Sequence, residues 1–544
     1  MVADHDVIII GAGFAGLYQL YKLRELGFDA RVLEAGPEVG GTWYWNRYPG
    51  ARCDIESIEY SYSFDPQLQQ SWNWTERYAA QPELLAYAKH VADRFDLRRD
   101  ITFDTRVVAM DFDDTTNEWT VTTEGEDRTA TESGDYVTAN FVIAATGCLS
   151  KPLVPSFDGL DDFAGDVLWT WDWPADGADL EGKRVAVVGT GSSGVQTITA
   201  IAPVVGALTV FQRTPPYAVP AQNRLIADEL ADVKQRYPQF RDVSRLSRGG
   251  AQCGDGAALP PFFGDLDSGT SRAELDRRWD DGGLCFQQSF YDLLLDPVAN
   301  ETAAEYVRER IRQKVSDPRL AEKLTPRTYP IAAKRMCVDT GYYEVYNQGN
   351  VELVDLNEEP LHRITARGIL AGDTEHEFDA IVLATGFDAM TGALNAIDIR
   401  AVDESGATRT LREKWAAGPR TYLGLMSAGF PNLFTVTGPQ SPSVLSNMLT
   451  SIEYHVEWIS AALVHLRDHG LNRMEADIEA EDNWVNITND TADLTLLPHA
   501  ASWYMGANVP GKRRVFLPFV AGVGVYKQIG DGVAVAGYHG FEMV

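Results

Sequence analysis

The sequence contains few cysteines, comparatively few basic residues and no long apolar run. Because it has no stretch of about 20 apolar residues, no membrane-spanning helix is expected. No basic segment with a cleavage site precedes the first apolar run, so no signal peptide is expected either. The 47 basic residues are outnumbered by 78 acidic ones, giving a net charge of −31. This charge argues against partners such as nucleic acid and anionic membranes.

The five cysteines, at positions 53, 148, 253, 285 and 337, show no paired spacing and form no C-x-x-C. This pattern predicts reduced thiols and a cytoplasmic location. The nine histidines show no metal-ligand spacing, so no metal site is expected. The G-x-S-x-G and H-E-x-x-H signatures of serine hydrolases and zinc peptidases are also missing.

A glycine-rich turn near the start follows a short β-branched run, DVIII. The spacing G-x-G-x-x-G is formed by Gly11, Gly13 and Gly16. The first glycine makes a tight turn, the second lets the backbone approach a pyrophosphate, and the third lets a helix pack on a strand. Glu34 ends the next predicted strand, 18 residues after Gly16, where a carboxylate can accept hydrogen bonds from a ribose diol. The segment therefore predicts a dinucleotide-binding unit.

The same pattern recurs in the middle of the chain, at Gly189, Gly191 and Gly194. Here the second strand ends in Arg213 and Thr214 instead of an acid. An arginine accommodates a 2′-phosphate through charge-assisted hydrogen bonds, which favours NADPH over NADH. Arg213 could also be an ordinary solvated residue at a strand end.

Two further apolar strands run into Ala-Thr-Gly, in FVIAATG at residues 141–147 and AIVLATGFD at residues 380–388. Such small residues let the chain pass close to a bound cofactor, although structural turns would explain either copy alone. The first unit is not followed by C-x-x-x-x-C, which argues against a disulfide reductase. Strands alternating with helices predict an α/β fold with parallel sheets.

These elements, in this order, resemble the flavoprotein monooxygenases that bind two dinucleotides. GTWYWNRYPGARCDIES (41–57), AKRMCVDTGYYEVYN (333–347) and SWYMGANVPGK (502–512) are similar to type I Baeyer–Villiger monooxygenases. GPQSPSVLSNMLTSIEYHVEW (438–458) is most similar to the phenylacetone and steroid monooxygenase branch. The resemblance covers almost the whole chain and is weakest at about 223–326. It implies FAD and NADPH as cofactors, and oxygen insertion beside a ketone carbonyl through a flavin peroxide, giving an ester or lactone.

The chain departs from the family fingerprint F-x-G-x-x-x-H-x-x-x-W-P. It has Phe163, Gly165, Trp173 and Pro174, but Trp169 stands where histidine is expected. In the family this histidine is associated with coordinating the two cofactor domains. Tryptophan can pack and donate one hydrogen bond, but it cannot accept one or titrate. Less efficient domain motion linked to NADPH is therefore expected.

The resemblance implies that Arg335 is the main catalytic residue and that Asp54 pairs with it. A permanent cation stabilises a peroxide anion and the negative adduct that forms on the carbonyl. The alternatives are a structural ion pair for Arg335 and a helix or turn cap for Asp54.

The resemblance also assigns the remaining site residues. Lys334, Arg213 and Thr214 are expected to contact the 2′-phosphate, and Trp503, which could also be ordinary packing, to hold the nicotinamide ribose through its indole N–H. Beside FAD we expect Asp54, Thr42, Trp43, Tyr44, Trp45 and Tyr48. Apolar residues suit a ketone pocket, and those expected to line it are Ile55, Leu149, Val444, Leu445 and Met448.

The sequence predicts a discontinuous FAD domain (1–145 and 385–544), an NADPH domain (146–220 and 330–384) and a helical insertion (221–329) that includes a mobile Gly- and Pro-rich loop. One rival function is a heteroatom oxygenase acting on amines or sulfides, whose soft nucleophiles need no oxyanion stabilisation. Another is a non-catalytic flavoprotein that responds to NADPH. The particular ketone and the oligomeric state are left open.

Overall fold

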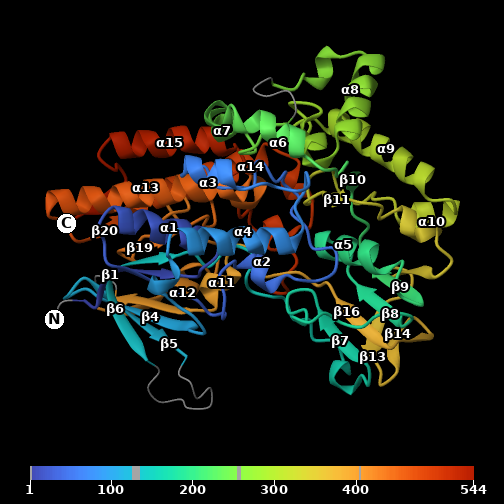
Figure 1. Cartoon of the computed structure of the whole chain (residues 1–544), viewed down its shortest axis with the longest axis horizontal. Helices are drawn as coiled ribbons and strands as arrows, with labels where there is room; N and C mark the ends of the chain where they lie inside the picture. The colour runs from blue at the N-terminus through green and yellow to red at the C-terminus, as the bar shows by residue number, and fades with distance from the viewer. Residues whose placement is uncertain (1–2, 125–134, 254–258, 403–405) are drawn as a thin grey trace.

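The computed structural model describes residues 3–124, 135–253, 259–402 and 406–544. Two separate β-sheets lie along one side of the molecule, and the long helices cover them from the other side (Figure 1). None of the helices in these ranges combines the length and the apolar character that a membrane crossing needs. The same ranges contain no group of three or more His, Cys, Asp or Glu side chains placed to hold a metal ion.

The larger sheet is built around β1 (His5–Ile10), which pairs in parallel with β2 (Ala30–Leu33) and β6 (Tyr136–Ala144). β1 is β-branched and its last four residues are buried, as both faces of a parallel strand require. A late strand, β19 (Leu433–Thr435), adds in parallel to β6. The other strands of this sheet are β3 (Ile101–Thr102), β4 (Val107–Asp113), β5 (Glu118–Thr123), β17 (Asp398–Val402) and β18 (Thr408–Thr410).

Helices cover the larger sheet and form its main core. α1 (Phe14–Glu25) follows β1 and packs against α13 (Met448–His469), which is the longest helix in Figure 1. The N-terminus of α13 is capped by Asn447, whose side-chain oxygen accepts from Leu449 N at 3.1 Å. Other helices on this side are α2 (Thr42–Trp45), α3 (Pro66–Ser71), α4 (Gln81–Arg94), α14 (Ile478–Asp493) and α15 (Val523–Val535).

The smaller sheet has five strands in the order β12-β9-β8-β16-β7, and all neighbours are parallel. They are β12 (Val351–Asp355), β9 (Ala207–Gln212), β8 (Arg184–Val188), β16 (Ala380–Leu383) and β7 (Asp166–Trp169). β8 and β9 are joined by α5 (Ser192–Ile201), and a small antiparallel sheet contains β13 (Leu361–Ile364), β14 (Gly368–Ala371) and β15 (Thr374–Glu377).

The α/β fold with two nucleotide-binding units is therefore confirmed. The larger sheet takes strands from 5–144 and 398–435, and the smaller one from 166–212 and 351–383. The exact domain bounds given above stay predictions.

Between the two parts of the smaller sheet, the chain forms a layer of helices at the upper right of Figure 1. Residues 221–329, for which a helical insertion was predicted, include α8 (Ser268–Asp281) and α9 (Pro297–Lys314). α9 starts with Pro297 directly after Asp296, whose side chain accepts from Val298 N. The Gly- and Pro-rich loop expected at 249–264 includes residues 254–258, which lie outside the described ranges. The other helices here are α6 (Ala227–Lys234), α7 (Tyr237–Leu246), η4 (Gly283–Gln288) and α10 (Pro318–Lys323).

The prediction that all five cysteines are reduced is wrong for two of them. Cys253 and Cys285 form a disulfide across 32 residues, whereas Cys53, Cys148 and Cys337 are free and buried. A disulfide requires two Cα atoms to come close in space, and the fold brings the end of the segment after α7 alongside η4. Spacing along the sequence carries no information about this approach.

A buried histidine on α13 gives the fold a dependence on pH. His455 is fully buried, and its Nδ1 accepts from Thr437 N at 2.9 Å. Burial lowers the pKa of His455 to about 3, from an ordinary value of 6.5. The side chain is therefore neutral in the folded protein and takes up a proton only on unfolding.

We expect the free energy of unfolding to fall by about 1.4 kcal/mol per pH unit as the pH drops below 6.5, until it approaches the folded-state pKa. The unfolded chain binds a proton in this range and the folded chain does not, so acid favours unfolding. Urea unfolding at about pH 7.5, 6.5 and 5.5 measures the slope. His455→Gln keeps an acceptor for Thr437 N but does not titrate. Equal slopes for the two proteins would contradict the assignment.

Candidate active site

The first glycine-rich turn has the close packing that its spacing predicts. A Cβ atom on Gly16 would lie 1.8 Å from Gly11 O, so only glycine fits there. Glu34, at the end of β2, accepts from Ala12 N at 2.6 Å and from Gly36 N at 2.8 Å. Burial raises the pKa of Glu34, and these two backbone N–H groups oppose the shift. The carboxylate is thus held in a fixed position beside the turn.

The second turn repeats this geometry. A Cβ atom on Gly194 would lie 2.1 Å from Gly189 O, whereas one on Gly191 would meet no atom within 4 Å. The space at Gly191 lies at the N-terminus of α5, where a helix favours anions. Beyond the end of β9, Arg213 is exposed and Thr214 O accepts from Thr190 Oγ1 at 3.1 Å.

The two Ala-Thr-Gly segments pack on these turns. Ala145 O lies 2.8 Å from the position that a Cβ atom on Gly11 would take, and Ala384 O lies 2.5 Å from the corresponding position at Gly189. Each segment follows a central parallel strand, β6 or β16. Each segment thus lies against the first glycine of a turn, and the close approach to a cofactor predicted for the two segments stays a prediction.

The short helix α2 (Thr42–Trp45) begins against the first turn. A Cβ atom on Gly41 would lie 2.9 Å from Gly13 Cα. Trp43 is buried, Thr42 is exposed, and the indole of Trp45 lies 2.9 Å from the Cβ position of Gly36, the glycine that also contacts Glu34. Thr42, Trp43 and Trp45 therefore lie next to the first turn, where FAD contacts were predicted.

Tyr48 reaches the other half of the molecule. Its hydroxyl donates to Gln196 Oε1 at 2.8 Å, and Gln196 Nε2 donates to Arg52 O at 3.0 Å. Gln196 belongs to α5, directly behind the second turn. The segment that contains Tyr48 thus connects the two nucleotide units, a contact that the sequence did not indicate.

Arg335 and Asp54, 281 residues apart, form a two-pronged ion pair. Arg335 Nε donates to Asp54 Oδ2 at 2.8 Å, and Nη2 donates to Oδ1 at 2.7 Å. Nη1 donates to Val444 O at 2.8 Å. The fork geometry fixes the plane of the guanidinium, and its other N–H bonds are available to further acceptors.

Arg335 carries a positive charge in the folded protein. Burial by itself would lower the pKa of Arg335, but the charge and the hydrogen bonds of Asp54 raise it above its ordinary value. Tyr504, which sequence reasoning missed, interacts with Arg335. Burial raises the pKa of the Tyr504 phenol to about 12, although the positive charge of Arg335 lowers it. Tyr504 is next to Trp503 in the sequence, and this adjacency was the one available signal.

Arg335 and Asp54 border a small, partly open cavity. Two of the residues predicted for a ketone pocket, Ile55 and Leu445, line it as well. Leu149, Val444 and Met448 pack instead with Leu445 in an adjoining apolar cluster. The cavity therefore combines apolar walls with charged groups, which are Arg335 and the carboxylates of Asp54, Glu56 and Glu59.

Lys334 lies beside Arg335 in the sequence and close to Arg213 in space. Burial, followed by the positive charge of Arg213, lowers the pKa of Lys334. Its Nζ also lies 4.6 Å from the centre of the Tyr329 ring. The structure thus brings Lys334 and Arg213 close together, which are two of the three residues expected to bind the 2′-phosphate. An anion placed between two such cations relieves their repulsion.

Two tryptophans were also singled out in the sequence, Trp503 and Trp169. Trp503 is half-buried at the start of η8 (Trp503–Met505), and its ring lies 4.4 Å from that of Tyr504. Trp169 ends β7 and pairs with Leu383 of β16. Its ring packs against Trp171 at 5.6 Å, so the residue at the fingerprint position acts as packing beside a central strand.

Comparison with known proteins agrees with this geometry. Residues 4–214 match the family model for flavin-binding monooxygenase-like proteins. The chain is 41% identical to an acetone monooxygenase (methyl acetate-forming) of Gordonia sp. (strain TY-5), covering 99% of both chains. It is 41% identical to a Baeyer–Villiger monooxygenase of Pseudooceanicola batsensis, covering 98% of this chain and 96% of the relative. A solved structure of oxidised steroid monooxygenase bound to NADP has a TM-score of 0.92 and 49% identity, covering 99% of each chain. With relatives of this similarity along its whole length, and with a forked Arg335–Asp54 pair at the cavity, the chain belongs to the Baeyer–Villiger monooxygenase family.

Proposed function

We propose that this enzyme converts ketones to esters or lactones, with FAD at the first glycine-rich turn, NADPH at the second and Arg335 as the catalytic cation. The observation that carries the proposal is the Arg335–Asp54 ion pair at the edge of a cavity that has apolar walls at Ile55, Leu284 and Leu445. A heteroatom oxygenase would have no need for a fixed cation there, because a soft nucleophile develops no oxyanion.

The two turns fit the two cofactors. At the first turn, Gly13 at the start of α1 and the fixed carboxylate of Glu34 suit a pyrophosphate and a ribose diol. At the second, the open space at Gly191 suits a pyrophosphate, and Lys334 with Arg213 would hold the 2′-phosphate. When bound, NADPH supplies a hydride to FAD, which then activates dioxygen for transfer to the ketone.

Arg335 would orient the substrate and stabilise negative charge. Asp54 fixes the guanidinium plane through both carboxylate oxygens, so the arginine does not reorganise when charge develops on the carbonyl oxygen. Because its pKa is raised by Asp54, Arg335 keeps its proton throughout. Asp54 is thus a positioning residue, and Ile55 and Leu445 supply apolar wall beside the guanidinium.

The substrate class follows from the cavity and from the relatives, whose names include acetone and steroid monooxygenases. We propose an uncharged ketone, because the lining around Arg335 includes the carboxylates Glu56 and Glu59, which would repel an anionic substrate. We also propose a cytoplasmic location, because NADPH must be regenerated after each turnover.

The test is NADPH consumption by the purified yellow protein with and without phenylacetone, with ester measured by gas chromatography. We expect ester to form in step with NADPH use. NADPH use that yields only hydrogen peroxide, with phenylacetone and with a panel of cyclic and steroid ketones, would contradict the proposal. Trp169→His then separates poor cofactor coupling from an unsuitable ketone, since only coupling responds to this change.

A further inference from the structure

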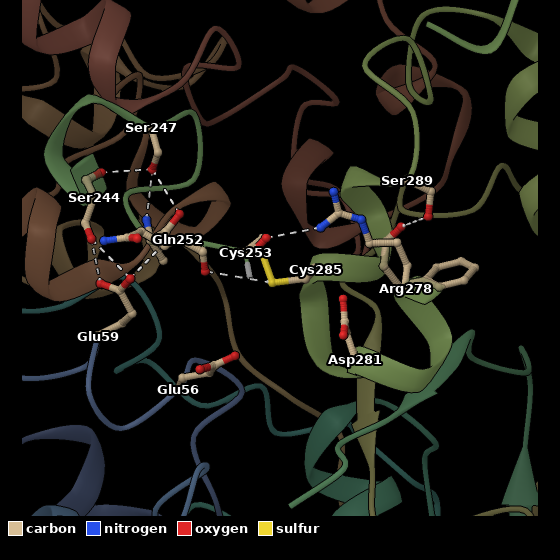
Figure 2. Close-up of a disulfide and its surroundings, with 12 residues drawn as sticks. Glu56, Glu59, Ser244, Ser247, Gln252, Cys253, Arg278, Asp281, Cys285 and Ser289 are labelled. Atoms are coloured by element: carbon tan, nitrogen blue, oxygen red, sulfur yellow. Dashed lines mark hydrogen bonds between the residues drawn. A yellow bond between two sulfur atoms is a disulfide. The ribbon is translucent and has the colours of Figure 1, made fainter. Parts of the chain in front are cut away.

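The cavity beside Arg335 is bordered by two cysteines that the proposed reaction does not use. Cys253 and Cys285 both line it, and they are joined by a disulfide. Figure 2 shows the bond between Gln252 on one side and Arg278 on the other. Both cysteines are only partly buried, which leaves the bond open to a small reductant. The disulfide therefore belongs to the wall of the candidate ketone pocket.

The bond joins segment 249–253 to η4, and both of these segments also contact α8. Cys285 belongs to η4 (Gly283–Gln288), which packs against α8. Cys253 is the last residue of the segment 249–253. Its carbonyl oxygen accepts from Arg278 Nη1 of α8 at 3.2 Å. This hydrogen bond is non-covalent and is therefore a weaker connection than the disulfide.

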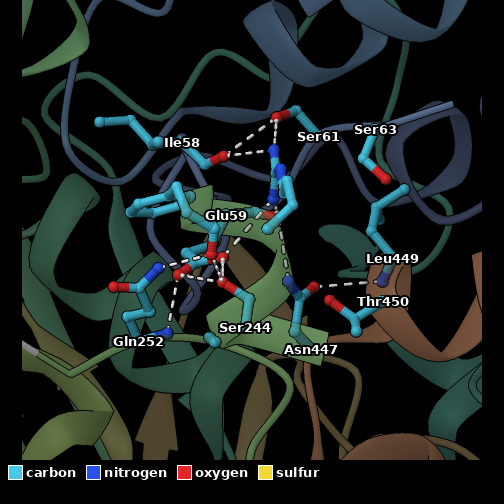
Figure 3. A network of polar contacts seen from close by, with 12 residues as sticks. Ile58, Glu59, Ser61, Ser63, Ser244, Gln252, Asn447, Leu449 and Thr450 are labelled. Carbon is cyan, nitrogen blue, oxygen red and sulfur yellow. Dashed lines mark hydrogen bonds and ion pairs between the residues drawn. The ribbon is translucent and has the colours of Figure 1, made fainter. Parts of the chain in front are cut away.

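The residue before Cys253, Gln252, is fixed by a buried carboxylate. Glu59 is 2% exposed and also lines the cavity. Its Oε1 accepts from Gln252 N at 2.7 Å, and its Oε2 accepts from Ser244 Oγ at 2.9 Å, as Figure 3 shows. Arg241 pairs with the same carboxylate at 3.5 Å. Gln252 is thus held independently of the disulfide that follows it.

This network extends to the residues next to Arg335. Asn447 Nδ2 donates to Glu59 O at 2.9 Å (Figure 3). Asn447 N donates to Gly249 O at 2.7 Å. Three residues before Asn447, Val444 O accepts from Arg335. The residues from Arg335 to Gln252 are therefore connected on one side of the cavity without the disulfide. The bond from Cys253 to Cys285 attaches these residues to η4.

We propose that the Cys253–Cys285 disulfide is a redox-controlled specificity determinant, which holds the two walls of the ketone cavity together when oxidised and lets the cavity admit bulkier ketones when reduced. The inference rests on the proposed function. After reduction the Glu59 network still holds Gln252 and Arg335 in place, so the catalytic cation is kept while η4 is released. In reducing compartments, disulfides are usually transient and serve redox sensing.

The reduction is an exchange with a dithiol. One thiolate of the dithiol attacks a sulfur of the Cys253–Cys285 bond and forms a mixed disulfide, and the second thiolate closes the ring of the oxidised dithiol. Two electrons pass from the dithiol to the protein, and the two cysteine thiolates each take one proton. Buried Cys53, Cys148 and Cys337 do not compete, because burial raises the pKa of each thiol above its ordinary value.

The experiment compares the oxidised wild type, the wild type reduced with dithiothreitol, and the variants Cys253→Ser/Cys285→Ser and Cys253→Ala/Cys285→Ala. The readout is kcat/KM for a steroid ketone relative to kcat/KM for phenylacetone. We expect this ratio to rise about tenfold on reduction, which is the size of effect that pocket shape has on discrimination. Both double variants should show the raised ratio without reductant and should not respond to it. An unchanged ratio in the reduced wild type would overturn the proposal.

A second measurement does not depend on turnover. Mass spectrometry of the non-reduced protein identifies the bond, and hydrogen exchange reports the opening of segment 283–288. We expect faster exchange in this segment after reduction, with Gln252 and residues 57–61 unchanged because the Glu59 network remains. Equal exchange in both states would overturn the inference even if the enzyme forms ester. Faster exchange in a protein that forms no ester would instead support the cross-link and contradict the proposed function.

Discussion

Replacement of Arg335 by alanine is expected to lower the kcat for ester formation by at least about 100-fold while FAD stays bound, because loss of one donor to a developing oxyanion typically has this effect. Arg335 contacts Asp54, Val444 O and Tyr504, whereas the first glycine-rich turn is built by other residues. The variant leaves Asp54 without its partner, so some loss of stability is also expected. The measurements are single-turnover ester yield and flavin absorbance.

The matched control is Arg184→Ala. Arg184 makes the same two-pronged contact, with Asp379 at 2.9 and 3.3 Å, on the exposed start of β8. Its loss should leave ester formation unchanged. Arg335→Lys separates charge from geometry, because lysine is cationic but cannot form the fork. Full ester yield from Arg335→Ala would show that the pair is structural and that another group stabilises the oxyanion.

Replacement of Lys334 by alanine is expected to raise the KM for NADPH about 10- to 100-fold, and to leave the KM for NADH nearly unchanged, because a charged hydrogen bond contributes about 1.5–3 kcal/mol. The lowered pKa of Lys334 reflects burial and the charge of Arg213, and a 2′-phosphate between the two would relieve this repulsion. Initial rates with both nucleotides give the ratio of the two KM values.

The conservative variant Lys334→Arg keeps the charge and should keep most of the preference for NADPH. Arg213→Ala should act in the same direction as Lys334→Ala. Because Lys334 precedes Arg335 in the chain, kcat at saturating NADPH must also be compared. A fall in kcat with an unchanged ratio of KM values would contradict a phosphate-binding role and would indicate instead that Arg335 had been displaced.

The sequence predicted those parts of the molecule that depend on local chemistry. The two glycine-rich turns were recognisable because Gly16 and Gly194 admit no side chain where helix and strand meet, and this restriction leaves a fixed spacing in the sequence. The strands that lead into the two turns, β1 and β8, are rich in β-branched residues because both of their faces are buried. The fold class followed from the order of these elements, and the pairing of Arg335 with Asp54 from the family resemblance.

The sequence did not predict contacts between distant segments that lack a motif. The bond between Cys253 and Cys285 depends on how the helical layer packs, and the hydrogen bonds of Glu59 to Ser244 and Gln252 depend on the same packing. The link from Tyr48 to Gln196 joins two units whose relative placement has no local signature. Each of these contacts requires knowledge of the tertiary structure.

The interleaving of the two sheets affects the order in which the protein can assemble during synthesis. The smaller sheet has all its strands once β16 has left the ribosome at Leu383. The larger sheet starts with β1 at His5, and β5 pairs with residues 136–139 of β6, but the edge of β6 at residues 142–144 waits for β19 (Leu433–Thr435). Until then that edge exposes unpaired N–H and C=O groups, which favour pairing with other chains. The unit that begins first is therefore completed last, and its nascent form is the one expected to need a chaperone.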